Sequence, residues 1–463
     1  KNYSKMSTPA GLFAIYNALR KIYPNQTNPL QVSALVKYWL NGPDPLDYIT
    51  MYANAGDARL GIPPHWHYIS CGLSDLYGDG RVHDVTGNDG ISGFGFELTM
   101  RLKRDADEDS PPTWPAELMQ CLAKYVFKTE TSFCSGDHIS WHQALDTKHN
   151  YIEHMLLTYD PQLPELSTPY GSLNFIQIVG ICAEELFAAQ HWNGFAIINL
   201  MKQIPAALMQ ILLKCSLPSE DLFISIFVRA GGHWLLTDMT RCESIFAFNP
   251  RLLELVEVGI NEEGSDLSGV SANCWWSECS KLTIYREALQ AHNSCNNAPS
   301  PNNSVLSVRI RSSSKSNLPN QEEQPSTDSL SRTSNYSCIN GLFAAKSIQN
   351  GIQLRFNLEA AALFPLAIRG RLAHGRHFTF KSVVSDSAIT FVTSDVIGSS
   401  VNDKSPFAAI QSWLQVLVTD DFLEILVKDL EELQRPHKLK LPRLYVWPEQ
   451  NLMITVTDDG VNV

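Results

Sequence analysis

The sequence predicts a mixed α/β (α+β) fold with two domains that hold mixed sheets and flanking helices. Its 463 residues are too many for one compact core and are typical of two or three domains. Segments with strand and helix patterns follow one another without a regular βαβ rhythm, which favours an α+β or mixed α/β arrangement. Near Ala288 the composition changes, and a long loop is expected to interrupt the second half of the chain.

A helix is expected from about Pro29 to Leu40. Asn28 occupies the N-cap position, and Pro29 fits the first helical position, where a backbone N–H is not needed. Apolar residues then recur at helical spacing until Asn41-Gly42-Pro43 ends the pattern. A turn and an extended segment follow at residues 44–48.

The clearest strand runs from Phe94 to Lys103, where apolar and polar residues alternate without a break. This period of two predicts one buried face and one face exposed to solvent. The other segments of this half with an extended pattern are His65–Ser70, Phe133–Trp141 and Phe175–Ile181.

Two further helices are predicted in the same half of the chain. One lies around Ala183–Gln190, and the other follows Pro115. The second of these would place five residues on one side: Leu118, Cys121, Leu122, Tyr125 and Val126.

The segment 288–337 is rich in Ser, Asn, Pro and Gln and has almost no aromatic residues. Such a segment buries too little apolar surface to offset its chain entropy, so a disordered loop of roughly fifty residues is expected. Its accessible serine hydroxyls are candidate phosphorylation sites.

Regular structure is predicted again after this loop. A helix should span about Asp420–Leu433, with Thr419 as its cap. Its inward residues would be Leu423, Leu426, Val427 and Leu430. The predicted strands are His377–Ser382, Ile389–Thr393, Trp413–Val418 and Leu452–Thr457.

Charge and composition exclude several classes of protein. The formal net charge of −12 makes a broad phosphate-neutralising surface unlikely, so direct binding to nucleic acid is not expected, whereas a basic protein partner is compatible with it. No window has the ~18 apolar residues that a membrane span needs, and no signal peptide is visible. The ten cysteines contain no CxxC pair, which is typical of reduced thiols in the cytosol or nucleus.

Two groups of residues contain the ingredients of an enzyme site. His65 and His67 would lie on the same face of a strand, and with Asp75 they could ligate a metal; the alternative is a structural histidine pair with satisfied hydrogen bonds. Cys134 and His138 could form a nucleophilic site, although no oxyanion-hole or nucleophile-elbow motif accompanies them. For this second segment a recognition surface is the preferred interpretation, because Asp137 could pair with an incoming cation.

Several longer motifs resemble the Suppressor of fused family. In the first half they are NPLQV at 28–32, KYWL at 37–40, GPDPLDY at 42–48, HWHYISCGLSDL at 65–76, GFGFELT at 93–99, PPTWP at 111–115 and FCSGDH at 133–138. In the second half they are LSGVSA at 267–272, RGR at 369–371, HGRHFT at 374–379 and WPE at 447–449. The resemblance covers nearly the whole chain outside the Ser/Asn-rich loop.

This resemblance implies an N-terminal domain at 8–262 and a C-terminal domain at 263–463, hinged near 264–269. It also implies that a Gli-type peptide with a Ser-Tyr-Gly-His core lies in the cleft between the domains and adds a strand to an edge of each. Binding of this kind is β-augmentation, in which backbone hydrogen bonds supply affinity and side-chain pockets supply selection.

The resemblance also assigns six peptide-binding residues. Asp137 would receive the peptide histidine through a charged hydrogen bond worth roughly 1.5–3 kcal/mol, and Tyr125 would line the same pocket. Val270 and Ala272 would belong to the second-domain strand, and Leu363 to the facing part of that domain. Tyr159 stands where vertebrate members carry a glutamate, which removes one acidic contact from the pocket.

The function implied by the resemblance is negative regulation of Hedgehog signalling in the cytoplasm and nucleus, with no catalytic step and no cofactor. The expected partners are Gli/Ci-type zinc-finger transcription factors and a Fused-type kinase. The apolar stretch 207–229 has no counterpart in the family, and the sequence leaves open whether it is an added helix and strand or an artefact of sequence assembly.

Overall fold

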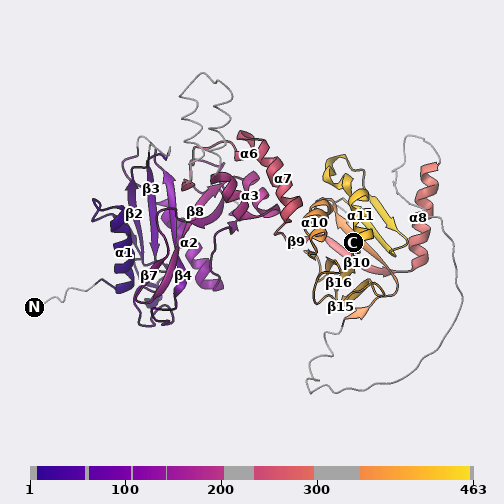
Figure 1. Ribbon diagram of the computed structural model, residues 1–463, viewed down its shortest axis with the longest axis horizontal. Coiled ribbons are helices and arrows are strands. Elements are labelled where there is room, and N and C mark those ends of the chain that lie inside the picture. Colours follow the sequence, from indigo (N-terminus) through magenta and orange to yellow (C-terminus); the bar gives the residue numbers. More distant parts are fainter. Residues whose placement is uncertain are drawn as a thin grey trace, which may run out of the picture. The chain divides into compact units, whose positions relative to one another are not determined.

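The computed structural model describes residues 8–57, 62–105, 108–141, 143–202, 234–296 and 345–458. The chain forms two compact units, residues 1–258 and 259–463, and each is described here by itself (Figure 1). Within the described ranges, no helix is long and apolar enough to cross a membrane. The apolar stretch 207–229 lies outside the described residues.

The first unit is built on an eight-stranded mixed sheet with the order β1-β2-β3-β4-β8-β6-β5, to which β7 adds by pairing with β8. Strands β4 and β8 are parallel, and the other neighbours are antiparallel. The strands are β1 (Leu30–Ser33), β2 (Tyr48–Asn54), β3 (His65–Cys71), β4 (Ile91–Lys103), β5 (His138–Ile139), β6 (His154–Tyr159), β7 (Leu166–Thr168) and β8 (Gly171–Ile181).

Helices cover both faces of this sheet (Figure 1). Helix α1 (Ala10–Ile22) buries Leu12, Ile15 and Leu19 against one face. Helix α2 (Trp114–Thr129) buries Leu118, Leu122 and Val126 against the other. The unit also contains α3 (Ala183–His191) and α6 (Ile245–Phe248), and α7 (Arg251–Glu263) begins in it. The predicted strands at 65 and 175 and the helix at 183 are confirmed.

The helix predicted from Pro29 to Leu40 is wrong. Residues 30–33 form β1, which pairs with β2 at an end of the sheet, and only the turn η1 (Tyr38–Leu40) is helical. Pairing with β2 satisfies the backbone of β1, and a helix of about eleven residues would be marginal without tertiary support. The predicted stop is correct, because Asn41 adopts a left-handed conformation with φ of 62°.

Strand β4 is confirmed, but its predicted solvent-facing side is not exposed. Glu97, Thr99 and Arg101, which alternate with the apolar residues, are all completely buried. The apolar face packs against α2, and the polar face enters hydrogen-bonded networks within the protein. Polar side chains can be buried in this way when their hydrogen bonds are satisfied.

Two other predictions for the first unit need correction. The inward side of α2 does not include Cys121 or Tyr125, because both side chains are exposed. The extended segment expected at 133–141 contains only the two residues of β5, and a turn precedes them.

The second unit contains two sheets. One has four strands in the order β10-β12-β18-β17, and the other has six in the order β11-β15-β16-β14-β13-β9. The strands are β9 (Gly269–Ala272), β10 (Cys274–Cys279), β11 (Lys346–Ser347), β12 (Gly351–Asn357), β13 (Phe378–Ser382), β14 (Ala388–Val392), β15 (Phe407–Ile410), β16 (Trp413–Leu417), β17 (Arg443–Trp447) and β18 (Leu452–Thr457). The four strands predicted for this half are confirmed.

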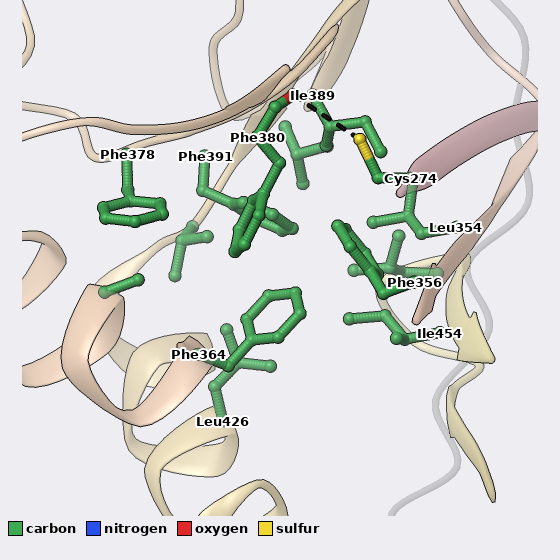
Figure 2. Close-up of a cluster of buried hydrophobic side chains, with 14 of the residues drawn as sticks. Cys274, Leu354, Phe356, Phe364, Phe378, Phe380, Ile389, Phe391, Leu426 and Ile454 are labelled. Atoms are coloured by element: carbon green, nitrogen blue, oxygen red, sulfur yellow. Dashed lines mark hydrogen bonds between the residues drawn. The ribbon is translucent and has the colours of Figure 1, made fainter. Parts of the chain in front are cut away.

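An aromatic cluster forms the core of the second unit. Figure 2 shows Phe356 from the four-stranded sheet, Phe380 from the six-stranded sheet and Phe364 from a helix, packed edge to face or tilted with ring centroids 4.9–5.1 Å apart. Such geometries are preferred by aromatic pairs. The helices of this unit are α8 (Lys281–Asn296), α9 (Leu358–Ala361), α10 (Phe364–Gly370) and α11 (Asp420–Asp429), with short turns η3 (Leu372–His374), η4 (Glu431–Gln434) and η5 (Pro436–Lys438).

Two boundaries in the second unit differ from the predictions. The helix expected at Asp420–Leu433 ends at Asp429, and the Thr419 side chain makes no capping hydrogen bond. Val427 is exposed rather than inward. The predicted loop begins later than residue 288, because α8 continues to Asn296 and buries Ala288; the remainder of the loop lies outside the described residues.

Candidate functional site

Strand β5 forms an end of the sheet in the first unit, and no strand among the described residues pairs with its outer edge, called the open edge below. The N–H of Gly136 donates to the carbonyl of Leu157 (2.8 Å), and the N–H of Leu157 donates to the carbonyl of Asp137 (2.8 Å). Backbone groups alternate in direction along an antiparallel strand. The N–H and C=O of His138 therefore point away from β6, toward the open edge.

Asp137 lies where the turn 134–137 enters this edge strand. One of its carboxylate oxygens accepts a hydrogen bond from the backbone N–H of Cys134 (2.7 Å), which fixes the side chain above the turn. The residue is exposed, so its negative charge is accessible to a ligand that pairs with the edge. A protonated histidine or a lysine of an extended peptide could donate a charge-assisted hydrogen bond to this carboxylate.

Aromatic residues flank Asp137. The ring of Tyr125, on α2, stacks on that of Phe133 with parallel planes and centroids 6.1 Å apart. Tyr159 ends β6, opposite the same turn, and is 54% exposed. Tyr125 is 52% exposed, so both phenols offer surface to a ligand. The structure therefore places the three predicted residues of the first unit around the β5 end of its sheet.

Close backbone packing supports the turn from below. Gly194, the first helical residue after Asn193, lies so near the turn that an added Cβ would be 1.9 Å from the carbonyl oxygen of Gly136. Gly136 has a φ of +99°, and its own Cβ would lie 3.3 Å from Phe195. The sequence analysis did not identify Gly194 and Phe195 as parts of this site, because nothing in the local pattern links them to residues about sixty positions earlier.

In the second unit, β9 is an end strand of the six-stranded sheet and pairs in parallel with β13. The carbonyl of Ser268 accepts from Thr379 of β13, and that of Ala272 accepts from Val383, directly after β13, each at 3.0 Å. By alternation, Gly269 and Ser271 direct their backbone N–H and C=O groups toward the open edge. This strand can therefore hydrogen-bond to a further strand.

The three predicted residues of the second unit share one hydrophobic core. Ala272 is a buried member of it, and Val270 and Leu363 pack against it while remaining partly exposed. Leu363 directly precedes α10. Val270 and Ala272 thus anchor the edge strand to the core, and Leu363 packs against the same core.

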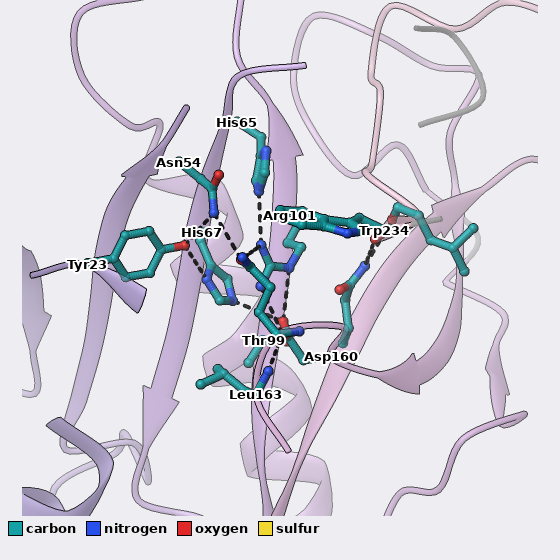
Figure 3. Close-up of polar contacts among 12 residues, drawn as sticks. Tyr23, Asn54, His65, His67, Thr99, Arg101, Asp160, Leu163 and Trp234 are labelled. Carbon is teal, nitrogen blue, oxygen red and sulfur yellow. Dashed lines mark hydrogen bonds and ion pairs between the residues drawn. The ribbon is translucent and has the colours of Figure 1, made fainter. Parts of the chain in front are cut away.

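The histidine pair of β3 belongs to a buried polar network (Figure 3). His67 is hydrogen-bonded through Nδ1 to the Tyr23 hydroxyl (2.8 Å) and through Nε2 to Asp160 (3.0 Å). His65 is bonded to the carbonyl of Pro63 (2.9 Å) and to the guanidinium of Arg101 (3.0 Å). All four ring nitrogens are occupied, so the structural alternative describes this pair.

Burial and charge keep these histidines neutral. Burial, reinforced by the positive charge of Arg101, lowers the pKa of His65 to about 3 and that of His67 to about 4. Burial alone would raise the pKa of Asp160, but its contacts with His67 and Arg101 hold this pKa well below the usual range. The network therefore holds one buried anion and one buried cation at neutral pH.

The other residues considered for catalysis do not form a site. Asp75 turns one carboxylate oxygen toward the backbone N–H groups of Tyr77 (2.9 Å) and Gly78 (2.8 Å) and so stabilises its own loop. Cys134 and His138 are both exposed, and no hydrogen bond joins their side chains. Among the residues with described positions, no group of three His, Cys, Asp or Glu side chains could hold a metal ion.

Comparisons with known proteins identify relatives over both units. Residues 42–241 match the family model "Suppressor of fused protein (SUFU)", and residues 254–456 match "Suppressor of Fused Gli/Ci N terminal binding domain". The Suppressor of fused homologs of Mus musculus and Homo sapiens are each 46% identical over 470 residues, which cover 97% of this chain and 92% of each relative. The crystal structure of Drosophila Suppressor of Fused matches with 33% identity, a TM-score of 0.70 and 97% coverage of both chains.

These relatives carry the name of a regulatory family and not of an enzyme family, so no catalytic activity is indicated. The matches extend over almost the whole chain and include both units. The chain belongs to the Suppressor of fused family.

Proposed function

We propose that this chain is a negative regulator of Hedgehog signalling that captures a short extended peptide of a Gli/Ci-type zinc-finger transcription factor. The peptide, with a Ser-Tyr-Gly-His core, adds a strand to β5 of the first unit and to β9 of the second. Bound in this way, the factor is sequestered in the cytoplasm and its transcriptional activity is repressed in the nucleus. A Fused-type kinase is a second expected partner, to which no residue is assigned.

The open edges of β5 and β9 carry this proposal. All six residues assigned to peptide binding lie on these strands, next to them, or in the core that supports them. His138, Gly269 and Ser271 supply unpaired backbone groups, which an extended peptide can use irrespective of its sequence. Asp137 and the exposed phenols of Tyr125 and Tyr159 supply selection.

The family comparison supports the class of partner. The second unit matches a model whose description names Gli/Ci N-terminal binding. Since the chain carries a net charge of −12, attraction to a basic zinc-finger protein is physically reasonable. Charge of this kind raises the rate of encounter, whereas the paired edges determine the affinity.

The test is calorimetric titration of the whole chain with a Ser-Tyr-Gly-His peptide. Asp137→Arg should weaken binding by roughly tenfold to a hundredfold, because a charged hydrogen bond is lost and a like charge faces the peptide histidine. The matched control is Asp109→Arg, at an exposed acid after the C-terminal end of β4, a strand that β8 and β6 separate from β5. Equal affinities of the wild type and Asp137→Arg would exclude the role assigned to Asp137.

A further inference from the structure

Strand β17 is another end strand of the C-terminal unit, drawn in yellow in Figure 1, and no described strand pairs with its outer edge. The backbone N–H of Ile352, in β12, donates to the carbonyl of Asn451 (2.9 Å), the residue directly before β18. The odd-numbered residues of this segment therefore direct their backbone groups toward β12. By alternation, the even-numbered residues of β18 bond to the odd-numbered residues of β17. Leu444 and Val446 therefore turn their backbone N–H and C=O groups to the open edge.

The outward backbone groups of this edge are unpaired. Val446 is only 3% exposed because its side chain packs in a cluster with Ile284 and Ala288 of α8, and within the described ranges its backbone has no hydrogen-bond partner on the outward side. Val446 lines a cavity of about 480 Å³, bounded by β17, the end of α11 and the turns η4 and η5. Unpaired backbone groups of an end strand that face a cavity can bond to the backbone of a ligand strand.

Rigid aromatic groups form one wall of this cavity. Tyr445 and Trp447 stack with ring centroids 6.2 Å apart and an interplanar angle of 8°. The hydroxyl of Tyr445 donates to Glu432 (2.8 Å), and the indole N–H of Trp447 donates to Asp429 (2.9 Å). Glu432 also accepts from Arg443 at 2.6 Å, so both acids are already engaged in holding this wall.

In the rest of the lining, three basic side chains stand against one acid, Glu431. Lys428, Arg435 and Lys438 line the cavity, and none of them forms an ion pair with another described residue. The segment 435–443 contains four Lys or Arg side chains, one histidine and no acid, in a chain whose net charge is −12. A cationic cavity beside an open strand is suited to an acidic extended chain.

We propose that the edge of β17 is a second peptide-docking site, separate from the β5 and β9 edges, and that it takes an extended acidic peptide. The peptide backbone pairs with Leu444 and Val446. Its acidic side chains lie against Arg435 and Lys438, and alternate apolar side chains cover the Tyr445–Trp447 wall. This site is a sequence-tolerant interaction surface with a preference set by charge.

The first test is fluorescence anisotropy of the full chain with a labelled nine-residue peptide that alternates Glu and Val. The same peptide with N-methyl groups on alternate residues keeps its charge but cannot pair with a strand, and a Lys/Val peptide reverses the charge. The proposal is supported if the Glu/Val peptide binds saturably and the N-methylated and Lys/Val peptides do not. Absence of saturable binding up to about 1 mM, or equal binding of the N-methylated peptide, overturns it.

Two variants locate the site. Lys438→Glu should weaken the Glu/Val peptide by roughly tenfold, whereas Lys440→Glu, an equal charge change at an exposed residue that does not line the cavity, should leave it unchanged. Val446→Pro removes the outward N–H and also changes the packing of this side chain against α8. It should abolish binding of the Glu/Val peptide, and retained binding of the Ser-Tyr-Gly-His peptide shows that the chain is still folded. Equal losses in both lysine variants, or tighter binding of a single-stranded oligonucleotide, would contradict a peptide site.

Discussion

The carboxylate of Asp160 accepts two hydrogen bonds from the guanidinium of Arg101, at 2.8 and 3.0 Å, and neither side chain is exposed to solvent. Asp160 directly follows Tyr159, the last residue of β6, and its N–H donates to the carbonyl of Phe175 (2.9 Å). The buried pair therefore fixes the end of the strand from which Tyr159 projects. Loss of the Arg101–Asp160 pair would therefore also disturb the position of Tyr159 in the candidate peptide site.

Replacement of Arg101 by Met is expected to destabilise the first unit by about 3–5 kcal/mol, because it leaves the charge of Asp160 buried without a partner. The measurement is the free energy of unfolding from urea titration. The double variant Arg101→Met with Asp160→Asn removes both charges and should lose less than the single variant.

Arg104→Met provides the comparison. Arg104 donates to the carbonyl of Glu108 and stacks over Trp66 near the surface, so its loss should cost about 1 kcal/mol or less. A loss of the same size for Arg101→Met would show that the buried pair contributes little to stability.

Acid should destabilise this network before its carboxylate is protonated. An unfolded histidine titrates near pH 6.5, whereas the folded pKa values are about 3 for His65 and about 4 for His67. Between those values the unfolded state binds more protons, so stability is lost as the pH falls from 6.5. The lowered pKa of Asp160 affects stability only at more acidic pH. Its stabilising contribution is fully present above the pKa of an unfolded aspartate and is lost as the pH falls below that value.

His65→Gln should therefore flatten the decline in stability between about pH 6.5 and 4.5, by at most about 1.4 kcal/mol per pH unit. Unfolding free energies at several pH values check this. A slope in His65→Gln equal to that of the wild type would contradict the assignment.

The alternation in β4 shows how far sequence could predict the fold. A period of two correctly predicted the strand and separated its two faces. It could not show that the polar face is buried, because the partners of Glu97 and Arg101 lie far away in the sequence. Ser70 and Asp160 are 27 and 59 residues from them. The local sequence shows which residues of a strand are polar. Whether those residues are buried depends on the distant segments that pack against them in the folded chain.

The region 29–40 shows the reverse failure. Cap residues and apolar spacing there are those of a helix, but strand pairing between Leu30–Ser33 and β2 overrides them. At the candidate site, recognition of the motif FCSGDH drew attention to Asp137, which is an exposed residue of the turn directly before β5. The support from Gly194 depends on a contact between distant backbones, and no local signal predicts it.

Gly194→Ala tests that support. Alanine is the better helix former, so the helix itself should not lose stability. The added Cβ, however, would meet the carbonyl oxygen of Gly136 at 1.9 Å and displace the turn that carries Asp137. We expect a loss of about 1–3 kcal/mol in unfolding free energy together with weaker binding of the Ser-Tyr-Gly-His peptide.

The control is Gly87→Ala, at an exposed glycine with φ of +77° and no neighbouring atom within 4 Å of its Cβ. That variant should lose some stability through backbone strain but keep the wild-type peptide affinity. Unchanged affinity in Gly194→Ala would separate the turn from peptide binding.

Ser271→Pro tests whether β9 pairs with a ligand strand. The N–H of Ser271 points to the open edge and makes no bond to β13, so its removal should cost the folded chain less than about 1 kcal/mol. A peptide that pairs with β9 would lose one backbone hydrogen bond and should bind roughly tenfold more weakly in calorimetry. Ser271→Ala, which keeps the N–H, is the matched control and should bind as the wild type does. If proline and alanine gave the same affinity, the side chains around Asp137 would account for recognition without strand addition at β9.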